Sequence, residues 1–383
     1  MKRLIKLTLG LVLGFTLGFV GVIAGITLFS DITFPEFLEK TVSIDFLTML
    51  GIILTSFASF FIALFLQIIF HEGGHLVCGL ATGYTFVSFR IGNLTLIRKD
   101  GRFLFKRFSI AGTGGQCLLA PPQAPLNEIP TAWYNMGGVL ANFLTATIAL
   151  IPVLCISGMP SFIVTFLVLF SVTGYFLSLT NGIPLKIGGI GNDADNMRLI
   201  LKNAASKQAL ITQLQVNALV QEGVRLKDMP AQWFPEKENI NYKDALQVSV
   251  RLMTASRYED MGDLDKAYTI FNDCLQHKDE LIGLFVKEVS CELLLIALVK
   301  GYTEQVNALY TEDTKSYINQ YKKVMSGKQV LLCALALYKE NDKAKAKNIY
   351  ETLCRQSDKY LMQGEVRMSI AFMQSILMAD DVL

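Results

Sequence analysis

The chain is poor in charge, in histidine and in paired cysteine. Only 18% of its 383 residues are Asp, Glu, Lys or Arg, and 52% are hydrophobic, whereas soluble domains average about 25% charged residues. A uniformly soluble protein is therefore not expected. The formal net charge of +2 provides no basic surface for nucleic acid, so we expect no nucleic-acid partner. The seven cysteines never occur as Cys-x-x-Cys, which argues against a disulfide framework or a cysteine zinc site.

The charge that is present is unevenly distributed. The first 196 residues contain 11 Lys/Arg and 9 Asp/Glu, and the remaining 187 contain 24 of each. This contrast predicts an apolar, membrane-embedded part that is followed by a charged, water-soluble part.

Four uncharged runs are long enough for membrane helices, which need about 20 residues to cross about 30 Å of hydrocarbon. The first is longer than the apolar region of a signal peptide and has no cleavage site after it, so we expect an uncleaved anchor. The runs cover residues 7–29, 46–70 (continuing past His71 and Glu72 to residue 82), 134–156 and 161–180. A multi-pass protein of the cell membrane, in contact with the lipid bilayer, is expected.

The orientation follows from the basic residues beside these runs. Most of them lie before the first run and between the second and third runs: Lys2, Arg3, Lys6, Arg90, Arg98, Lys99, Arg102, Lys106 and Arg107. Positively charged short segments stay in the cytoplasm. Both termini are therefore expected in the cytoplasm.

The segment between the second and third runs has the pattern of strands. Residues 84–91 and 102–108 roughly alternate apolar and polar side chains, and Asp100-Gly101 is a hairpin-turn signal. We expect a small antiparallel sheet at the inner face of the membrane. Residues 111–122, which are rich in Gly and Pro, are expected to form an irregular loop.

The most informative motif is His71-Glu72-Gly73-Gly74-His75. The chain has 3 histidines, so His-Glu-x-x-His should arise by chance with a frequency of order 0.001. Residues four apart share one helix face, so both imidazoles can reach one zinc ion, with Glu72 close to a metal-bound water. The alternative is a hydrogen-bonded group among packed helices. Ionisable side chains inside a membrane span are usually functional, which favours the metal site.

Gly73 and Gly74 have two equally supported explanations. Missing side chains would let a substrate strand approach the metal, and they would equally let a neighbouring helix pack closely.

A catalytic zinc site needs a third protein ligand. Two carboxylates, Asp193 and Asp195, follow the fourth run at the level expected for the histidines. We expect Asp193 to be the ligand, because Asp195 suits the N-cap of the next helix; Asp195 remains the alternative ligand. His277 lies far away in the polar part and is expected to be a solvated residue at a helix end.

These features together resemble the site-2 protease family of intramembrane zinc metallopeptidases. Residues 137–142 resemble the family's Gly-Pro-x-x-Asn element, although Gly138 replaces the proline, and residues 181–184 match its Asn-x-x-Pro. Pro184 lies nine residues before Asp193, farther than in the family pattern, and no PDZ-like domain is present. The resemblance covers about residues 46–196.

The resemblance implies a mechanism and a substrate class. Zinc-bound water would attack a peptide bond of a membrane-anchored peptide or regulatory protein near the cytoplasmic side, with Glu72 as general base. By the same analogy Asn142 would orient the substrate. An edge of the sheet over residues 84–107 could hold the locally unwound substrate as an added strand.

The polar part shows a weak repeat of amphipathic helices. Residues 257–271, 300–310 and 338–350 are similar, and their closing aromatics, Phe271, Tyr310 and Tyr350, lie 39 and 40 residues apart. They resemble degenerate tetratricopeptide hairpins. Such an array commonly binds a partner, here a cytoplasmic protein or the substrate's tail; a stabilising helical cap is the alternative.

We therefore expect an α-helical membrane protein with about four spans, a small membrane-associated β-sheet and an all-α cytoplasmic repeat domain. Its parts would be an anchor with an outer loop (residues 1–45), a membrane-embedded zinc metalloprotease core (46–196) and a tetratricopeptide-like domain (197–383). The competing function is a membrane adaptor without protease activity. An intact Glu72 argues against it, because a structural zinc needs no general base. The absence of other histidines in the membrane part disfavours a metal transporter.

Overall fold

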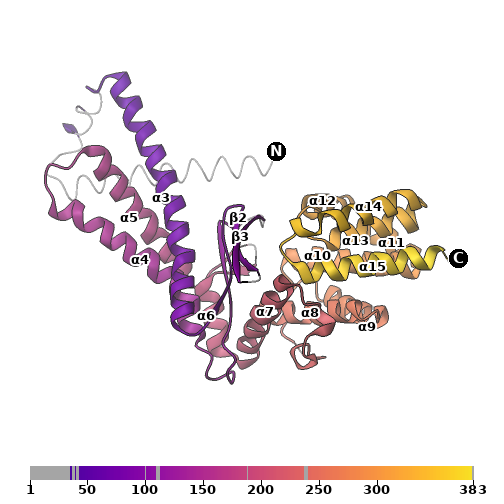
Figure 1. Ribbon diagram of the computed structural model, residues 1–383. Helices are drawn as coiled ribbons and strands as arrows, with labels where there is room; N and C mark the ends of the chain where they lie inside the picture. The colour runs from indigo at the N-terminus through magenta and orange to yellow at the C-terminus, as the bar shows by residue number, and fades with distance from the viewer. Residues whose placement is uncertain are drawn as a thin grey trace.

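The structure, a computed structural model, describes residues 43–99, 101–108, 113–187, 189–236 and 240–381, together with Pro35, Glu36 and Glu39. The expected anchor over residues 7–29 lies outside the described residues. Figure 1 shows long helices on one side, a helical array on the other and a small sheet between them.

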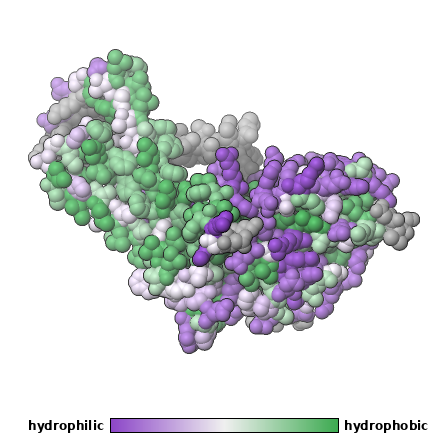
Figure 2. Space-filling view, viewed as in Figure 1, coloured by the Kyte–Doolittle hydropathy of each residue, from purple (hydrophilic) through white to green (hydrophobic). Residues whose placement is uncertain are grey.

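Three described helices are long and apolar enough to cross a membrane: α3 (Phe46–Ala81), α4 (Thr131–Cys155) and α5 (Ser161–Gly182). The α3 helix begins at Asp45, whose carboxylate accepts hydrogen bonds from the backbone N–H groups of Leu47 and Thr48. Large apolar side chains stay exposed on these helices, among them Phe57 and Phe176, and Figure 2 shows the continuous apolar surface that they form. A surface of this size suits contact with lipid.

The α3 and α4 helices approach each other closely at two glycines. A Cβ atom added at Gly74 would lie 2.2 Å from the carbonyl oxygen of Gly137, and one added at Gly137 would lie 2.4 Å from the carbonyl oxygen of Gly74. A Cβ atom at Gly73 would meet no described atom within 4 Å. Close helix packing therefore explains Gly74 but not Gly73.

The sheet has four antiparallel strands in the order β3-β2-β1-β4. The expected strands are present, and β2 and β3 form the expected hairpin around Gly101, whose φ is +76°. The strand bounds are β1 (Thr85–Ile91), β2 (Leu94–Lys99), β3 (Arg102–Arg107) and β4 (Gly115–Ala120).

The expectation of an irregular loop over residues 111–122 is wrong, because β4 lies within it and pairs with β1 from Thr85↔Ala120 to Ile91↔Gly115. The strand lies between α3 and the first helix of the array, α7 (Ala204–Glu222). Consequently Cys117, Leu118 and Leu119 are all buried, and a strand covered on both faces shows no alternation of polar and apolar residues.

A short connection follows the last membrane helix. The strands β5 (Lys186–Ile187) and β6 (Ile190–Gly191) pair as a small hairpin, and α6 (Asp193–Lys202) begins directly after it. The predicted domain boundary after residue 196 lies within α6, and the division of the chain into domains stays a prediction.

The rest of the chain is helical. It contains α7, η1 (Leu226–Asp228), η2 (Ala231–Trp233), α8 (Ala245–Asp260), α9 (Leu264–Gln276), α10 (Gly283–Lys300), α11 (Thr303–Leu309), α12 (Glu312–Tyr321), α13 (Gly327–Ala334), the π-helical turn η3 (Leu335–Lys339), α14 (Lys343–Gln356), η4 (Ser357–Lys359) and α15 (Gln363–Asp381). The three repeat segments become the turns of helical hairpins. Each turn has a residue with positive φ, Gly262 (83°), Gly301 (74°) and Asn341 (55°), spaced like the sequence repeat. The more specific likeness to tetratricopeptide repeats stays a prediction.

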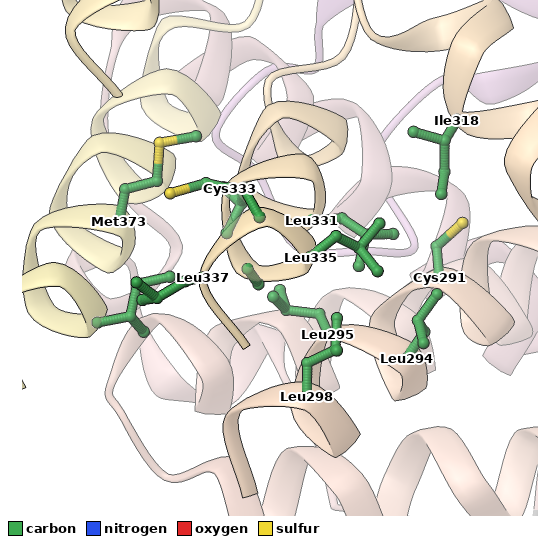
Figure 3. Packing of buried hydrophobic residues seen from close by; sticks show 14 of the residues in the cluster. Cys291, Leu294, Leu295, Leu298, Ile318, Leu331, Cys333, Leu335, Leu337 and Met373 are labelled. Carbon is green, nitrogen blue, oxygen red and sulfur yellow. The ribbon is translucent and has the colours of Figure 1, made fainter. Parts of the chain in front are cut away.

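The array has its own apolar core and closes on itself. Figure 3 shows part of this core, to which α10, α13 and α15 contribute Leu294, Leu331 and Met373. At the closing point α15 packs on α7, and the guanidinium of Arg367 donates a 2.8 Å hydrogen bond to the Gly223 carbonyl.

Three contacts attach the array to the sheet and to the β5–β6 hairpin. Gln221 Nε2 donates to the Val87 carbonyl of β1 at 3.1 Å, and Lys106 Nζ of β3 donates to the Tyr360 carbonyl at 3.0 Å. Gly189 of the hairpin lies against the Ile282 side chain. The array is therefore attached close to the start of α6.

The two adjacent glycines provide a matched test of the α3–α4 contact. Gly74→Ala should destabilise the protein by about 1–3 kcal/mol, because the new methyl group collides with backbone. Gly73→Ala should leave stability unchanged or raise it by up to about 1 kcal/mol, through helix propensity. Thermal unfolding of the purified protein in detergent would measure both effects, and equal effects would contradict this packing.

Candidate metal centre

Two histidines of α3 point their ring nitrogens at one position. His71 and His75 lie one helical turn apart, and their Nε2 atoms are 3.2 Å from each other. Both Nε2 atoms also approach Asp193 Oδ2, at 3.1 Å from His71 and 3.4 Å from His75. These are the only three residues among those the structure describes that form a group able to hold a metal ion.

The partners of the other ring nitrogens set the histidine tautomers. Asn142 Nδ2 donates to the Gln67 carbonyl (2.8 Å) and to Gln67 Oε1 (2.7 Å), which turns Asn142 Oδ1 toward His71 Nδ1 at 2.6 Å. His75 Nδ1 lies 2.7 Å from the Tyr134 carbonyl. Both partners can only accept, so both Nδ1 atoms carry the proton. The Nε2 lone pairs are therefore free to bind a metal.

The third side chain is positioned by Asn192, the residue just before it. Asn192 Nδ2 donates to the Thr180 and Ile183 carbonyls at the end of α5, and Asn192 Oδ1 accepts from the N–H of Asp195 at 2.9 Å. Asn192 is therefore the N-cap of α6. The expectation that Asp195 caps this helix is wrong, because Asn192 already occupies that position.

The two candidate carboxylates have different surroundings. Asp195 is 1% exposed, forms an ion pair with Arg198 and lies 4.0 Å from Lys186 Nζ. It does not belong to the histidine group. Asp193, in contrast, faces both imidazoles.

The distances within the group fit a tetrahedral zinc ion. Ligand atoms that lie about 2.0–2.1 Å from zinc at tetrahedral angles are about 3.3 Å apart, and the three separations here are 3.1, 3.2 and 3.4 Å. Asp193 Oδ2 is buried without a hydrogen-bond partner of good geometry. Three unprotonated donors that converge in this way repel one another unless a cation lies between them. Two imidazoles and one carboxylate are a ligand set used by zinc.

Gly138 keeps space open beside the imidazoles. A Cβ atom at this position would lie 2.5 Å from His75 Nε2 and 2.6 Å from His71 Cε1. The sequence showed Gly138 only as a departure from the family pattern. The structure indicates that any side chain here would collide with the metal centre.

Glu72 lies beside the group, against the first residue of β4. It is largely buried, and a Cβ atom added at Gly115 would lie 2.6 Å from Glu72 Oε1. The buried Arg90 holds this part of the chain in place, because it donates hydrogen bonds to the Gly115 carbonyl (3.0 Å) and to Thr113 Oγ1 (2.6 Å). The sheet therefore extends directly to the carboxylate of the His-Glu-x-x-His motif.

Sequence reasoning missed several residues around the centre. Gln67, completely buried one turn before His71, could have been found as an isolated amide in an apolar helix. Tyr134 acts through its backbone carbonyl, which gives no sequence signal. Arg90 was counted only as one of the basic residues that set the membrane orientation, so its role beside Glu72 gave no signal either.

The zinc content of three variants distinguishes a metal ligand (Asp193), a residue that orients a ligand (Asn142) and a residue that does not bind the metal (Asp195). Wild type should bind about one zinc ion per chain, and Asp193→Asn should weaken zinc binding more than Asn142→Ala, which removes only the support of His71 and should cost about 10–100-fold. Asp195→Asn should retain zinc. Elemental analysis after dialysis against graded chelator would measure this order, and zinc loss in Asp195→Asn with retention in Asp193→Asn would reverse the assignment.

Comparison with known proteins identifies the family. The chain matches the family described as peptidase family M50, the site-2 protease family, over residues 59–373. No curated protein and no solved structure matches it. The family match includes the metal centre and most of the helical array, and thus extends well beyond the residues that carried the resemblance in the sequence. Because it covers more than half of the chain, this protein belongs to peptidase family M50, whose members are zinc metallopeptidases.

Proposed function

We propose that this protein is an intramembrane zinc endopeptidase that cleaves a membrane-anchored peptide or protein near the cytoplasmic side. The observation that carries the proposal is the convergence of Asp193, at the start of α6, on His71 and His75, which flank Glu72 in a long apolar helix. Family membership supports the reaction class. The substrate class is inferred from the family resemblance, and the orientation in the membrane from the distribution of basic residues.

In this proposal each side chain has a defined role. His71, His75 and Asp193 would hold a zinc ion, which would supply a Lewis acid and an acidified water. Glu72 would act as the general base, accepting a proton on its carboxylate and passing it to the leaving amine. Asn142 is completely buried and bonded to Gln67 and His71. We therefore assign it to orienting His71, in place of the substrate contact that the family analogy implied.

The carboxylate of Glu72 is suited to proton transfer because no other group holds it. Its side chain makes no hydrogen bond or ion pair with another residue of the described ranges, and the Arg90 guanidinium donates its hydrogen bonds to Gly115 and Thr113 instead. A general base must be free to reach the water that it deprotonates.

Glu72→Gln should retain zinc and fold but lower peptide cleavage by a factor of about 10²–10⁴, the usual contribution of a general base. Glu128→Gln, at an exposed position on the loop before α4, is the matched control and should cleave normally. Cleavage of a library of single-span peptides by purified protein in detergent would measure both. A library left intact by wild type, with zinc bound, would favour the adaptor function.

We propose further that substrate is held at the β4 edge of the sheet. A membrane helix hides its peptide bonds in internal hydrogen bonds, so it must unwind before cleavage. The sheet has two edge strands. β4 contacts α3, and its first residue, Gly115, lies against Glu72, whereas β3 forms the opposite edge. An added strand beside β4 would bring its peptide bonds close to the metal centre.

Cysteine cross-linking distinguishes the two edges. Gln116 on β4 and Phe105 on β3 are both exposed. With a substrate that carries a cysteine near its cleavage site, Gln116→Cys should cross-link several-fold more than Phe105→Cys in a Glu72→Gln background. Proline scanning of the substrate should also move or abolish cleavage, because proline removes a strand hydrogen bond. Equal cross-linking at both positions would exclude pairing at β4.

The helical array is proposed to bind a cytoplasmic protein or the substrate's cytoplasmic tail. The array contacts the β5–β6 hairpin, which leads directly into Asp193. Binding in the array could therefore act on the position of this carboxylate.

A further inference from the structure

A second site with unbalanced charge lies inside the helical array. A cavity of about 240 Å³ is enclosed by α7, α8, α10, α13 and α15, and none of its lining residues belongs to the metal centre. Its walls are largely apolar and include four methionines, Met253, Met325, Met362 and Met368. Its charged lining consists of four carboxylates and one ammonium group: Glu259, Glu288, Glu292, Glu365 and Lys328.

The lysine compensates only part of this negative charge. Lys328 is 1% exposed, and its Nζ atom lies 2.7 Å from Glu288 Oε2 and 3.6 Å from Glu292 Oε1. Glu365 has neutral partners, because its Oε1 accepts from Ser326 Oγ (2.9 Å) and from the Gly327 N–H (3.0 Å). With all groups ionised, the cavity has three more negative charges than positive charges.

Glu259 has no polar partner among the residues that the structure describes. It is 5% exposed and lines the cavity, and its side chain makes no hydrogen bond or ion pair with any residue in the described ranges. Burial raises the pKa of Glu259 well above its usual range, and the neighbouring Glu292 and Asp260 raise it further, against the opposing effect of Lys328. Burial also raises the pKa of Glu292, to about 7. A buried carboxylate without a partner is costly unless a cation or a proton compensates it.

We propose that this cavity binds an alkylammonium group, of the kind at the end of a lysine side chain of a peptide. The methionine walls can enclose the methylene groups, since thioether side chains adapt to irregular shapes, while the ammonium group meets the free carboxylate of Glu259. A divalent cation is less suited, because Mg²⁺ and Ca²⁺ require six or more oxygen ligands, and two of the four carboxylates, Glu288 and Glu292, already face the Lys328 ammonium group. The volume suits a single side chain, since pockets for larger ligands exceed about 300 Å³.

The test uses the full chain in detergent micelles and radiolabelled Nα-acetyl-lysine amide in equilibrium dialysis. Wild type should bind one molecule per chain. The norleucine analogue, which lacks the ammonium group, should compete at least tenfold more weakly. Glu259→Gln should weaken binding at least tenfold and leave the thermal unfolding temperature unchanged or higher, because it removes an unpaired buried charge. The matched control is Glu351→Gln on the exposed face of α14, which should bind as wild type does.

A second variant fills the cavity without changing its charge. Ser256 lines the cavity one helical turn before Glu259, and Ser256→Leu should also abolish binding. No saturable binding by wild type, equal binding of lysine amide and its norleucine analogue, or full binding by folded Glu259→Gln would overturn the proposal. If Glu259→Gln does not fold, full binding by Ser256→Leu would overturn it. Binding of Mg²⁺ or Ca²⁺ by a protein that does not bind lysine amide would also overturn the proposal. The readout is binding alone and does not depend on peptidase activity.

Discussion

The close packing of α3 against α4 determines the geometry of the metal centre. Gly74 and Gly137 let the two backbones approach each other, so the Tyr134 carbonyl of α4 reaches His75 Nδ1. The same contact brings Asn142 against His71. Because each Nδ1 proton is engaged by α4, each Nε2 lone pair faces the common position on the other side of the ring. Helix spacing alone aligns the two imidazoles, but the neighbouring helix fixes which nitrogen of each ring can bind a metal.

The third donor depends on a different part of the chain. Asn192 joins the end of α5 to the first turn of α6, and this bridge places Asp193 over the two imidazoles. Lys186 Nζ and Gly189 of the adjoining hairpin contact the Lys243 carbonyl and Ile282 of the array. The metal centre is thus built from one rigid pair of helices and one turn that the array supports. A change in the array would reach Asp193 through this turn before it reached the histidines.

The sequence predicted the features that depend on local spacing. His71, Glu72 and His75 follow from the helical period, and the β2–β3 hairpin follows from alternation around a turn signal. The β4 strand could not be found in this way, because its burial between α3 and α7 removes the alternation that identifies a strand. Asn192 and Asp195 are both good N-caps, and only the three-dimensional bridge to α5 decides between them.

Residues that act through long-range contacts left still less signal. Arg90 and Glu259 read as ordinary charged residues of a strand and a helix, because the burial that makes each of them exceptional comes from segments distant in the chain. Gln67 is an intermediate case: an amide within an apolar helix is conspicuous, but its link to Asn142 requires the fold. The four methionines around the cavity come from three separate segments, so no sequence window contains the site.

The metal centre and the array cavity present the same physical problem with different chemistry. Each gathers buried groups with lone pairs or negative charge that the cationic side chains of the described residues do not fully compensate. In the metal centre, the tautomers are fixed and the three donors lie at tetrahedral spacing, which favours zinc. In the cavity, Lys328 already faces two of the four carboxylates, and flexible thioethers form much of the wall, where a metal ion would require further oxygen ligands. The donor set, more than the amount of uncompensated charge, therefore decides that the first site suits a metal ion and the second an organic cation.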